Sequence, residues 1–265
     1  GEWQVAWEAR GEVVAVGTTY GQLHVVERTG KVRCSRAAPT GLAGVVFCGS
    51  TEVLCVTYDG KLYRLSVRSA DAGSALPEAS ASLLETAGGG VDGVVGCISI
   101  DAARHVLYVG GATRGLPSLT RWRTPPGAEI APMPSRFNRA EELPSPNPAF
   151  TTMRDAGQPA LHACCQLRVS PSGRFVAAAD TGGRAIVWPA DGGTAPVACA
   201  NADSVTDLAW WGDEALAMVQ RVGAVTIDAL ADGANLLGDP EVFNPFSALC
   251  SVSDGAEQHQ LMVLE

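Results

Sequence analysis

The sequence predicts an all-β fold, and three observations lead to this prediction. Hydrophobic residues make up 46% of the 265 residues and charged residues only 18%, so the chain has ample material for a core. Thirty Gly and sixteen Pro are spread along the chain without a collagen-like period, which indicates many turns and many short elements. The third observation is an internal repeat of strand-like segments at similar spacing.

The repeat consists of an apolar strand, a turn that contains glycine and a second strand. The glycines that open this second strand are separated by 39, 55, 68 and 40 residues, and they are Gly21, Gly60, Gly115, Gly183 and Gly223. Two of these intervals match the roughly 40–45 residues of a WD-type propeller blade, and the other two match it after loop insertions. A β-sandwich also has short strands, but it has no reason to repeat at 39 and 40 residues.

A further strand precedes each repeat, so every unit reads strand, tight turn, strand, tight turn, strand. The Pro and Gly of Ser170–Gly173 are typical of such a turn. In chain order the expected segments are 3–7, 12–21 and 22–26; 42–47, 52–60 and 61–65; 94–100, 105–111 and 116–122; 165–169, 174–183 and 184–188; 205–210, 214–223 and 224–228; and a partial sixth unit, 246–252 and 260–264.

The polarity of the strands indicates how the units pack. The second strand of each unit is almost wholly apolar and the third alternates, as expected if the inner strands lie between neighbouring sheets. One blade cannot bury its own faces, so the blades must assemble to be stable. We therefore expect a WD-type β-propeller of seven blades. This sequence covers about five to six of them as a single domain, residues 1–265, that opens and ends in mid-blade as a fragment of a longer chain.

A proline-rich insertion at about 125–159 interrupts the period between the third and fourth units. This segment holds eight of the sixteen prolines. Because proline removes backbone donors and blocks strand pairing, we expect an extended, mobile loop that is exposed to solvent. The alternative is functional, with phosphorylation at Ser145-Pro146 or docking of the proline-rich run into a groove.

The charge of the chain argues against direct contact with nucleic acid. The formal net charge is −9 and the pI is near 4.9, whereas nucleic-acid backbones need clustered Lys and Arg. Local basic residues such as Arg121 and Arg123 read as solvated charges at a strand end. No apolar run approaches the roughly 18 residues needed to cross a bilayer.

The eight cysteines favour neither a metal site nor a disulfide framework. None forms a C-x-x-C pair, and Cys164 and Cys165 are adjacent. Most lie in apolar runs, so we expect them to be reduced and buried.

The sequence contains no motif that carries catalytic chemistry. It lacks a phosphate-binding G-x-x-x-x-G-K-[ST] loop, H-E-x-x-H, the G-x-S-x-G elbow and an EF-hand loop. The four histidines, at 24, 105, 162 and 259, have no partner at metal-ligand spacing, although a ring could bring them together. Acid pairs such as Asp213-Glu214 and Glu141-Glu142 read as solvated charge. We expect no enzyme, no cofactor and no catalytic or metal residues, with an enzymatic propeller as the rival reading.

Adjacent tryptophans stand out in the fifth unit. Alternation along a strand puts Trp210 and Trp211 on opposite faces, so one is expected in the core and the other against a neighbour or solvent. Core packing is favoured over a role at a partner interface.

Several segments resemble, in the same order, the N-terminal propeller of the neuroblastoma-amplified sequence (NBAS) family. They are WQVAW at 3–7, VLYVGG at 106–111 with LTRW at 119–122, LRVSPSG at 167–173, VTDLAWWGD at 205–213, AVTI at 224–227 and NLLG at 235–238. These are mainly packing and turn residues. The kinetochore Rod protein has a similar propeller followed by helices and is the alternative relative.

The resemblance implies a function in vesicle tethering at the endoplasmic reticulum. It implies a cytoplasmic subunit, peripheral at that membrane, of the complex that receives Golgi-derived vesicles through ER SNAREs in retrograde transport. It also implies that tether subunits and SNAREs are contacted mainly through a helical, Sec39-like region that this sequence does not contain. The alternative is a protein-interaction scaffold that regulates nonsense-mediated mRNA decay. The residues that bind partners are not assigned.

Overall fold

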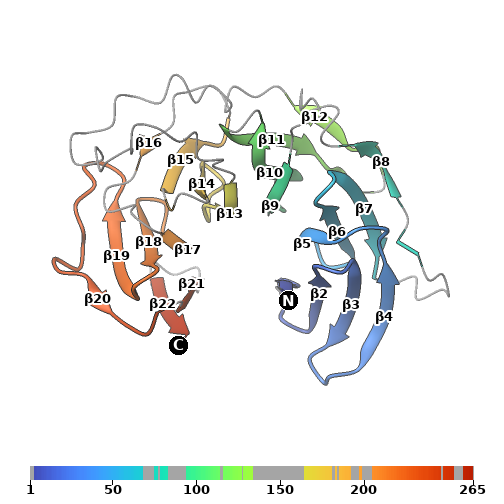
Figure 1. Cartoon of the computed structure of the whole chain (residues 1–265), viewed down its shortest axis with the longest axis horizontal. Coiled ribbons are helices and arrows are strands. Elements are labelled where there is room, and N and C mark those ends of the chain that lie inside the picture. Colours follow the sequence, from blue (N-terminus) through green and yellow to red (C-terminus); the bar gives the residue numbers. More distant parts are fainter. Residues whose placement is uncertain are drawn as a thin grey trace. The chain divides into compact units, whose positions relative to one another are not determined.

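The computed structural model describes an all-β protein whose regular elements are antiparallel strands (Figure 1). The described residues are 3–67, 75–76, 78–82, 94–113, 116–126, 128–133, 164–180, 183, 185–191, 197–198, 205–245, 247–253 and 259–264. Among these residues there is no helix that is long and apolar enough to cross a membrane. The predicted all-β class is confirmed.

The described strands form six sheets, and in each sheet the strands lie side by side in chain order. Sheet 1 contains β1 (Trp3–Trp7), β2 (Val13–Thr18), β3 (Gln22–Glu27) and β4 (Val32–Ala37). Sheet 2 contains β5 (Leu42–Cys48), β6 (Glu52–Thr57), β7 (Lys61–Ser66) and β8 (Glu78–Ser82). Sheet 3 contains β9 (Val94–Asp101), β10 (Val106–Thr113), β11 (Leu116–Arg123) and β12 (Ala131–Met133).

The remaining three sheets follow the same plan. Sheet 4 contains β13 (Cys164–Val169), β14 (Phe175–Asp180), β15 (Ala185–Pro189) and β16 (Val197–Ala198). Sheet 5 contains β17 (Val205–Trp211), β18 (Ala215–Gln220), β19 (Ala224–Ala229) and β20 (Glu241–Val242). Sheet 6 contains the two described strands β21 (Ala248–Ser253) and β22 (His259–Leu264).

The fourth strand of each complete sheet was missed by the sequence analysis, which expects three strands per repeat. In sheets 3, 4 and 5 this strand has only three, two and two residues, so it carries almost no periodic signal. One of these strands, β12, lies inside the proline-rich insertion, where we expect a loop. Pro132 pairs opposite Trp122 at the outer edge of sheet 3, where a residue without an N–H is tolerated. Residues 134–159 of the insertion, and with them Ser145, lie outside the described residues.

The glycine turns predicted between the second and third strands are confirmed in four sheets. Each of these glycines has a positive φ, and its N–H donates to the carbonyl three residues earlier. They are Gly21, Gly60, Gly183 and Gly223, with φ of 84°, 79°, 79° and 87°. Gly115, the fifth predicted glycine, lies outside the described residues.

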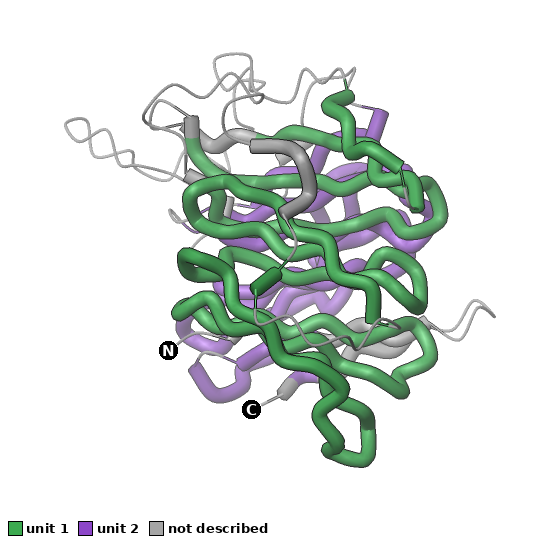
Figure 2. The backbone as a smooth tube through the Cα atoms, turned by 90° about the vertical axis from the view of Figure 1, so that its right-hand side faces the viewer, with its two compact units in different colours: residues 1–114, 119–133 green, residues 115–118, 134–265 purple. Residues whose placement is uncertain are grey.

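Contacts between residues divide the chain into two compact units (Figure 2). Unit 1 is formed by residues 1–114 and 119–133, and it holds sheets 1 and 2 and most of sheet 3. Unit 2 is formed by residues 115–118 and 134–265, and it holds sheets 4, 5 and 6. That residues 1–265 are one domain stays a prediction.

In unit 1, sheet 2 is packed on both faces. Phe47, Cys55 and Leu65 on one face share a core cluster with Ala15 and Val25 of sheet 1. The opposite face contributes other side chains of β5, β6 and β7 to a second cluster with sheet 3, among them Ala43, Leu54, Leu62, Leu107 and Trp122. Each aliphatic or aromatic side chain buried in this way contributes about 1.5–3 kcal/mol. Sheet 1, in contrast, exposes Val5 and Trp7 of β1.

In unit 2, sheet 5 is packed on both faces in the same manner. Leu208, Trp210 and Met218 join a cluster with sheet 4, while Ala209 and Val219 join a cluster with Leu249 of sheet 6 and other residues of sheet 5. Trp210 stacks on Phe175 with ring centroids 6.1 Å apart, and Trp211 packs against the other cluster. The prediction that the two tryptophans point to opposite faces is confirmed.

Free cysteines agree with the sequence expectation with one exception. Cys34, Cys48, Cys55 and Cys97 are buried, and burial raises the pKa of the Cys34, Cys48 and Cys55 thiols. Cys165 is exposed, which corrects the expectation of burial for this residue. Its position is the extra residue of a β-bulge between Cys164 and Gln166.

Candidate functional site

Among the described residues of unit 2, exposed apolar side chains group at the connection between β19 and β20, residues 230–240, which we call the leucine loop. In Figure 1 it lies at the outer side of sheet 5, beyond β19. The exposed fractions of Leu236 and Leu237 are 57% and 41%, and that of Val242, in the adjoining β20, is 74%. Large apolar side chains grouped at an exposed edge are a mark of interaction surfaces.

The leucine loop replaces the middle of a regular outer strand. Asn235 bridges Asp228 near one end of β19, and β20 pairs with Val225 and Ala224 near the other. The five residues between Asn235 and Glu241 include Gly238 and Pro240, which do not favour a continued strand. They therefore leave the line of the sheet.

The side chain of Asn235 holds the loop in shape. Its Oδ1 accepts hydrogen bonds from the amides of Ile227 at 3.1 Å and Leu237 at 3.2 Å, and its Nδ2 donates to the carbonyl of Gly238 at 3.3 Å. The first of these bonds takes the place of a bond between backbone groups of neighbouring strands. A single amide side chain thus fixes the two leucines relative to β19.

The backbone donors of the loop are used internally. The amide of Leu236 donates to the carbonyl of Ile227 at 2.7 Å, and that of Gly238 donates to the carbonyl of Asn235 at 3.0 Å. The Leu237 amide is bound to the Asn235 side chain, and Pro240 has no N–H. The amides at 236, 237 and 238 are therefore closed to pairing with an added strand, while the leucine side chains stay accessible.

Acidic residues surround the leucines. Asp232, Asp239 and Glu241 are exposed in or beside the loop. From Val222 to Glu265 the sequence contains seven Asp or Glu and no Lys or Arg. Three exposed carboxylates therefore flank the apolar side chains of the leucine loop along the chain.

A second exposed feature lies on unit 1, at the turns that end β2 and β6. Tyr20 is 82% exposed and Tyr58 is 38% exposed. The turns meet at Gly41, where an added Cβ would lie 2.2 Å from the carbonyl oxygen of Thr19 and 3.2 Å from the Tyr58 ring. Tyrosine side chains on a rigid backbone are suited to contacts with other proteins.

Asp59 fixes the position of these turns. Its Oδ1 accepts a hydrogen bond from Thr40 Oγ1 at 2.9 Å, which joins the turn of sheet 2 to the connection that enters this sheet. Burial alone would raise the pKa of Asp59, but hydrogen bonds from Thr57 and Thr40 outweigh burial and hold this pKa below its usual value.

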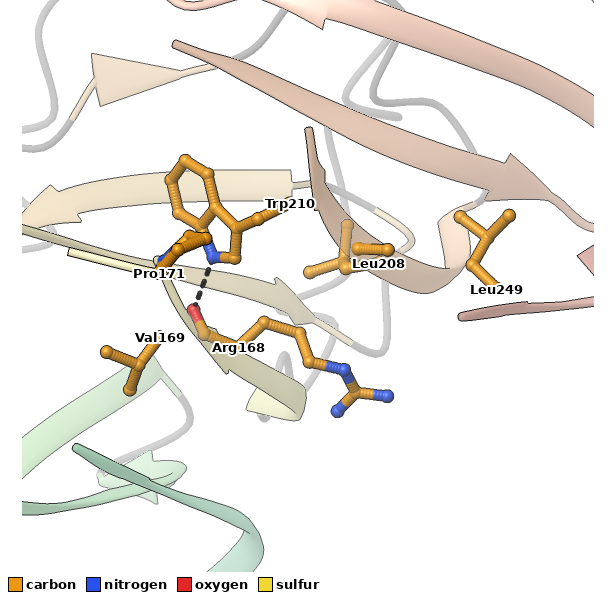
Figure 3. A pocket seen from close by; sticks show the side chains of 7 residues that line it. Arg168, Val169, Pro171, Leu208, Trp210 and Leu249 are labelled. Atoms are coloured by element: carbon orange, nitrogen blue, oxygen red, sulfur yellow. Dashed lines mark hydrogen bonds between the residues drawn. The ribbon is translucent and has the colours of Figure 1, made fainter. Parts of the chain in front are cut away.

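A hollow of about 280 Å³ lies on the first strands of the sheets in unit 2 (Figure 3). Trp210 Nε1 donates to the Arg168 carbonyl at 2.9 Å across it, and the guanidinium extends away from the indole. Six of the seven lining residues are apolar, and none is a nucleophile or a carboxylic acid; they are Arg168, Val169, Pro171, Leu208, Ala209, Trp210 and Leu249. The hollow is slightly smaller than the roughly 300 Å³ of the smallest usual ligand sites.

Asp207 joins three sheets beside this hollow. A β-bulge between Val205 and Asp207 interrupts the register of β17 at this carboxylate. Oδ1 accepts from Arg168 Nη2 at 3.1 Å and from the Leu208 amide at 2.9 Å, and Oδ2 accepts from the Leu249 amide at 2.9 Å. With both oxygens engaged, the carboxylate acts as a structural tie.

The histidines considered from the sequence lie in separate settings. His24 Nδ1 is 2.9 Å from Ser35 Oγ within sheet 1, and His105 occupies a left-handed turn with φ of 54° in sheet 3. His162 and the side chain of His259 lie outside the described residues. Within the part of the chain that the structure describes, no three His, Cys, Asp or Glu side chains are arranged to hold a metal ion.

The acid pair Asp213-Glu214 is more than the solvated charge expected from the sequence. Asp213 Oδ1 accepts a hydrogen bond from the Ser172 amide at 3.1 Å and so joins sheet 5 to sheet 4. Burial would raise the pKa of Asp213, but hydrogen bonds from Ser172 and Ser170 outweigh it and lower this pKa. Glu141-Glu142 lie outside the described residues.

From the sequence, Leu236 and Leu237 appear only in the segment NLLG at 235–238, among the packing and turn residues. The available signal was a pair of leucines in a segment rich in Gly, Asp and Pro, away from any strand periodicity. Whether these leucines are exposed depends on the path of the loop, which only the structure shows.

Comparison with known proteins gives a likeness of fold alone. No protein-family model matches the chain, and no curated protein matches it either. Among solved structures, the chain is similar to the computationally designed Ika8 protein with a TM-score of 0.59 and 12% sequence identity, over all of this chain and 71% of that one. At this identity the likeness concerns the arrangement of the strands and carries no function.

Proposed function

We propose that the chain is a WD-type β-propeller of seven blades, of which the six described sheets are the visible blades. The support is the sequence repeat together with the order of strands, because each complete sheet is a meander of four consecutive strands. The packing within each unit adds to this, since sheets 2 and 5 bury both faces against neighbouring sheets. Repetition of sheets stacked in this way is typical of propellers.

The domain functions as a non-catalytic module for protein interaction. The leucine loop carries this proposal, because it combines exposed apolar side chains with a backbone fixed by hydrogen bonds. A surface that is already ordered before binding loses little conformational entropy on association. The exposed tyrosines of unit 1 supply a second surface of the same kind.

A narrower proposal concerns the partners. The segments that resemble the NBAS propeller point to the complex at the endoplasmic reticulum that tethers Golgi-derived vesicles, with the protein peripheral to this membrane on its cytoplasmic side. This proposal depends on the resemblance alone.

The test is purification of the tagged 265-residue chain from chemically crosslinked cells, followed by mass spectrometry of the captured proteins. Enrichment of tether subunits or ER SNAREs is the expected result. Enrichment of decay factors without tether subunits would favour the role in mRNA decay. Absence of any protein crosslinked to unit 1 or unit 2 would contradict the interaction function itself.

A further inference from the structure

We infer that the leucine loop binds a basic, amphipathic helical segment of a partner protein. This inference rests on the proposed interaction function and specifies the chemistry of the partner at one surface. Three properties of the loop lead to it: the state of its backbone, the exposure of its leucines and the charge around them.

The backbone excludes strand addition as the mode of binding. An added strand needs free N–H and C=O groups at the edge of a sheet. The amides of Leu236, Leu237 and Gly238 already donate to groups of the same sheet or loop, and Pro240 has no amide hydrogen. None of these four residues has an amide open to an added strand, so the loop offers a partner mainly its side chains.

The leucines fit the apolar face of a helix. Leu236 and Leu237 are adjacent and both exposed, and the Asn235 side chain sets their direction. An amphipathic helix presents apolar side chains at i, i+3, i+4 and i+7, which form a stripe that can cover two neighbouring leucines. The backbone groups of such a helix are hydrogen-bonded to one another, so the helix needs no hydrogen bonds from the backbone of the loop.

The negative charge around the leucines favours a positively charged partner. Asp232, Asp239 and Glu241 are exposed in or next to the loop, and the sequence has no Lys or Arg from Val222 onward. Lys or Arg flanking the apolar stripe of the helix would meet these carboxylates, whereas Asp or Glu would be repelled. Electrostatic complementarity of this kind raises the association rate and weakens with salt.

The experiment measures binding of three labelled synthetic helical peptides to the 265-residue chain by fluorescence anisotropy. The first has leucines in a stripe flanked by lysines, the second has glutamates in place of the lysines, and the third has serines in place of the leucines. We expect the first peptide to bind, with an affinity that falls as salt rises. The affinity of each of the other two peptides should be lower by a factor of about ten or more.

Two variants of the chain locate the site. The first is the double variant Leu236→Ser, Leu237→Ser, and the second is the double variant Asp239→Lys, Glu241→Lys. Each should weaken binding of the first peptide about tenfold. Val32→Ser, at an apolar residue 53% exposed on sheet 1, is the matched control and should leave binding unchanged. All the changed side chains are exposed, and the circular dichroism spectrum should be that of the parent chain.

Equal binding of the first peptide to the parent chain and to the double serine variant would overturn the inference. So would equal binding of the lysine and glutamate peptides. If cellular partners are still captured by the double serine variant, the inference fails while the interaction function stands. If the parent chain captures no partner in cells, the proposed function fails whatever the peptides do.

Discussion

The outer edges of sheet 1 and sheet 5 have the same place in the strand order but different constructions. In sheet 1 the edge is β4, which pairs with β3 from Val32 to Ala37 with a β-bulge at Arg33, and which carries Arg33 and Arg36. In sheet 5 the edge is the two-residue β20, preceded by the leucine loop. A bulged edge that carries charged residues is protected against pairing with another strand, whereas the edge of sheet 5 groups three exposed apolar side chains. Sheets of the same strand order can therefore end in an edge protected by charged residues or in an edge that exposes apolar side chains.

The largest difference is expected when two glycines with the same φ are replaced by alanine. Gly223 enters β19 and Gly30 precedes β4, and both have φ of 87°. An added Cβ at Gly223 would lie 2.2 Å from the Phe243 carbonyl oxygen, while at Gly30 nothing lies within 4 Å. Gly223→Ala should lower the free energy of unfolding by about 3 kcal/mol or more, and Gly30→Ala by about 1 kcal/mol.

Urea unfolding of both variants measures these changes. The difference between them isolates the cost of pushing the segment after β20 away from the turn, since the strain of the left-handed backbone is common to both. Equal destabilisation by the two variants would show that the segment after β20 moves away from the added Cβ at no cost in free energy.

A smaller effect is expected for the side chain that shapes the leucine loop. Asn235→Ala removes two bonds accepted by Oδ1 and one donated by Nδ2, and it leaves the Ile227 amide without its partner. We expect a loss of about 1–3 kcal/mol in the free energy of unfolding. Ser35→Ala, on the edge strand of sheet 1, should change it by no more than about 0.5 kcal/mol.

The conservative variant Asn235→Asp serves as the control in the same urea series. It keeps the Oδ1 acceptor for the Ile227 and Leu237 amides, so it should retain more stability than Asn235→Ala. If both variants behave like the parent chain, the Asn235 side chain does not hold the loop.

The strand plan of these two sheets could be predicted from the sequence, and their edges could not. Alternation of apolar residues and the turn glycines at 21 and 223 place the first three strands correctly. β20 is too short for any periodicity, and its position depends on the Asn235 side chain and on the fit of Gly223 against the Phe243 carbonyl. These contacts join residues 8 and 20 positions apart, a separation that strand periodicity does not encode.

The candidate site was missed for the same physical reason. A pair of leucines reads as core material by composition, and exposure arises only because the loop leaves the line of the sheet between Asn235 and Glu241. Asp213 was likewise read as surface charge. Its bond to the Ser172 amide joins two sheets, and the sequence does not show which sheets lie side by side. The first outcome depends on the path of one loop, and the second depends on the contact between two sheets.

The hydrogen bond that Asp213 forms between sheets 5 and 4 should make the free energy of unfolding depend on pH in the acid range. The folded pKa is lowered below the ordinary 3.8, so this contribution to stability is fully present above pH 3.8 and is lost as pH falls through the folded pKa. Asp213→Asn cannot titrate, and its unfolding free energy should fall less steeply from pH 5 to pH 2. Urea midpoints across this range measure it, and parallel curves for the two proteins would refute the tie.

The smallest effect is expected at the ion pair on the edge of sheet 1. Arg33 Nε lies 3.0 Å from Glu27 Oε1, and the hydrogen bond from Arg33 is the main cause that lowers the pKa of Glu27. Both groups are solvated, so Arg33→Ala should leave the unfolding free energy unchanged within error. The Glu27 pKa should rise toward its ordinary value in an NMR titration, and an unmoved pKa would show that the pair does not form in solution.

The inference that the loop binds a helix depends on a leucine loop that is ordered although its leucines are exposed. Hydrogen exchange of single amides, followed by NMR in the 265-residue chain, tests this most directly. We expect the amides of Leu236, Leu237 and Gly238 to exchange well below the rate of an unstructured peptide, because each donates a hydrogen bond. Exchange of these three amides at the unstructured rate would contradict the account, because the loop would then be neither closed to strand addition nor preformed for a helix.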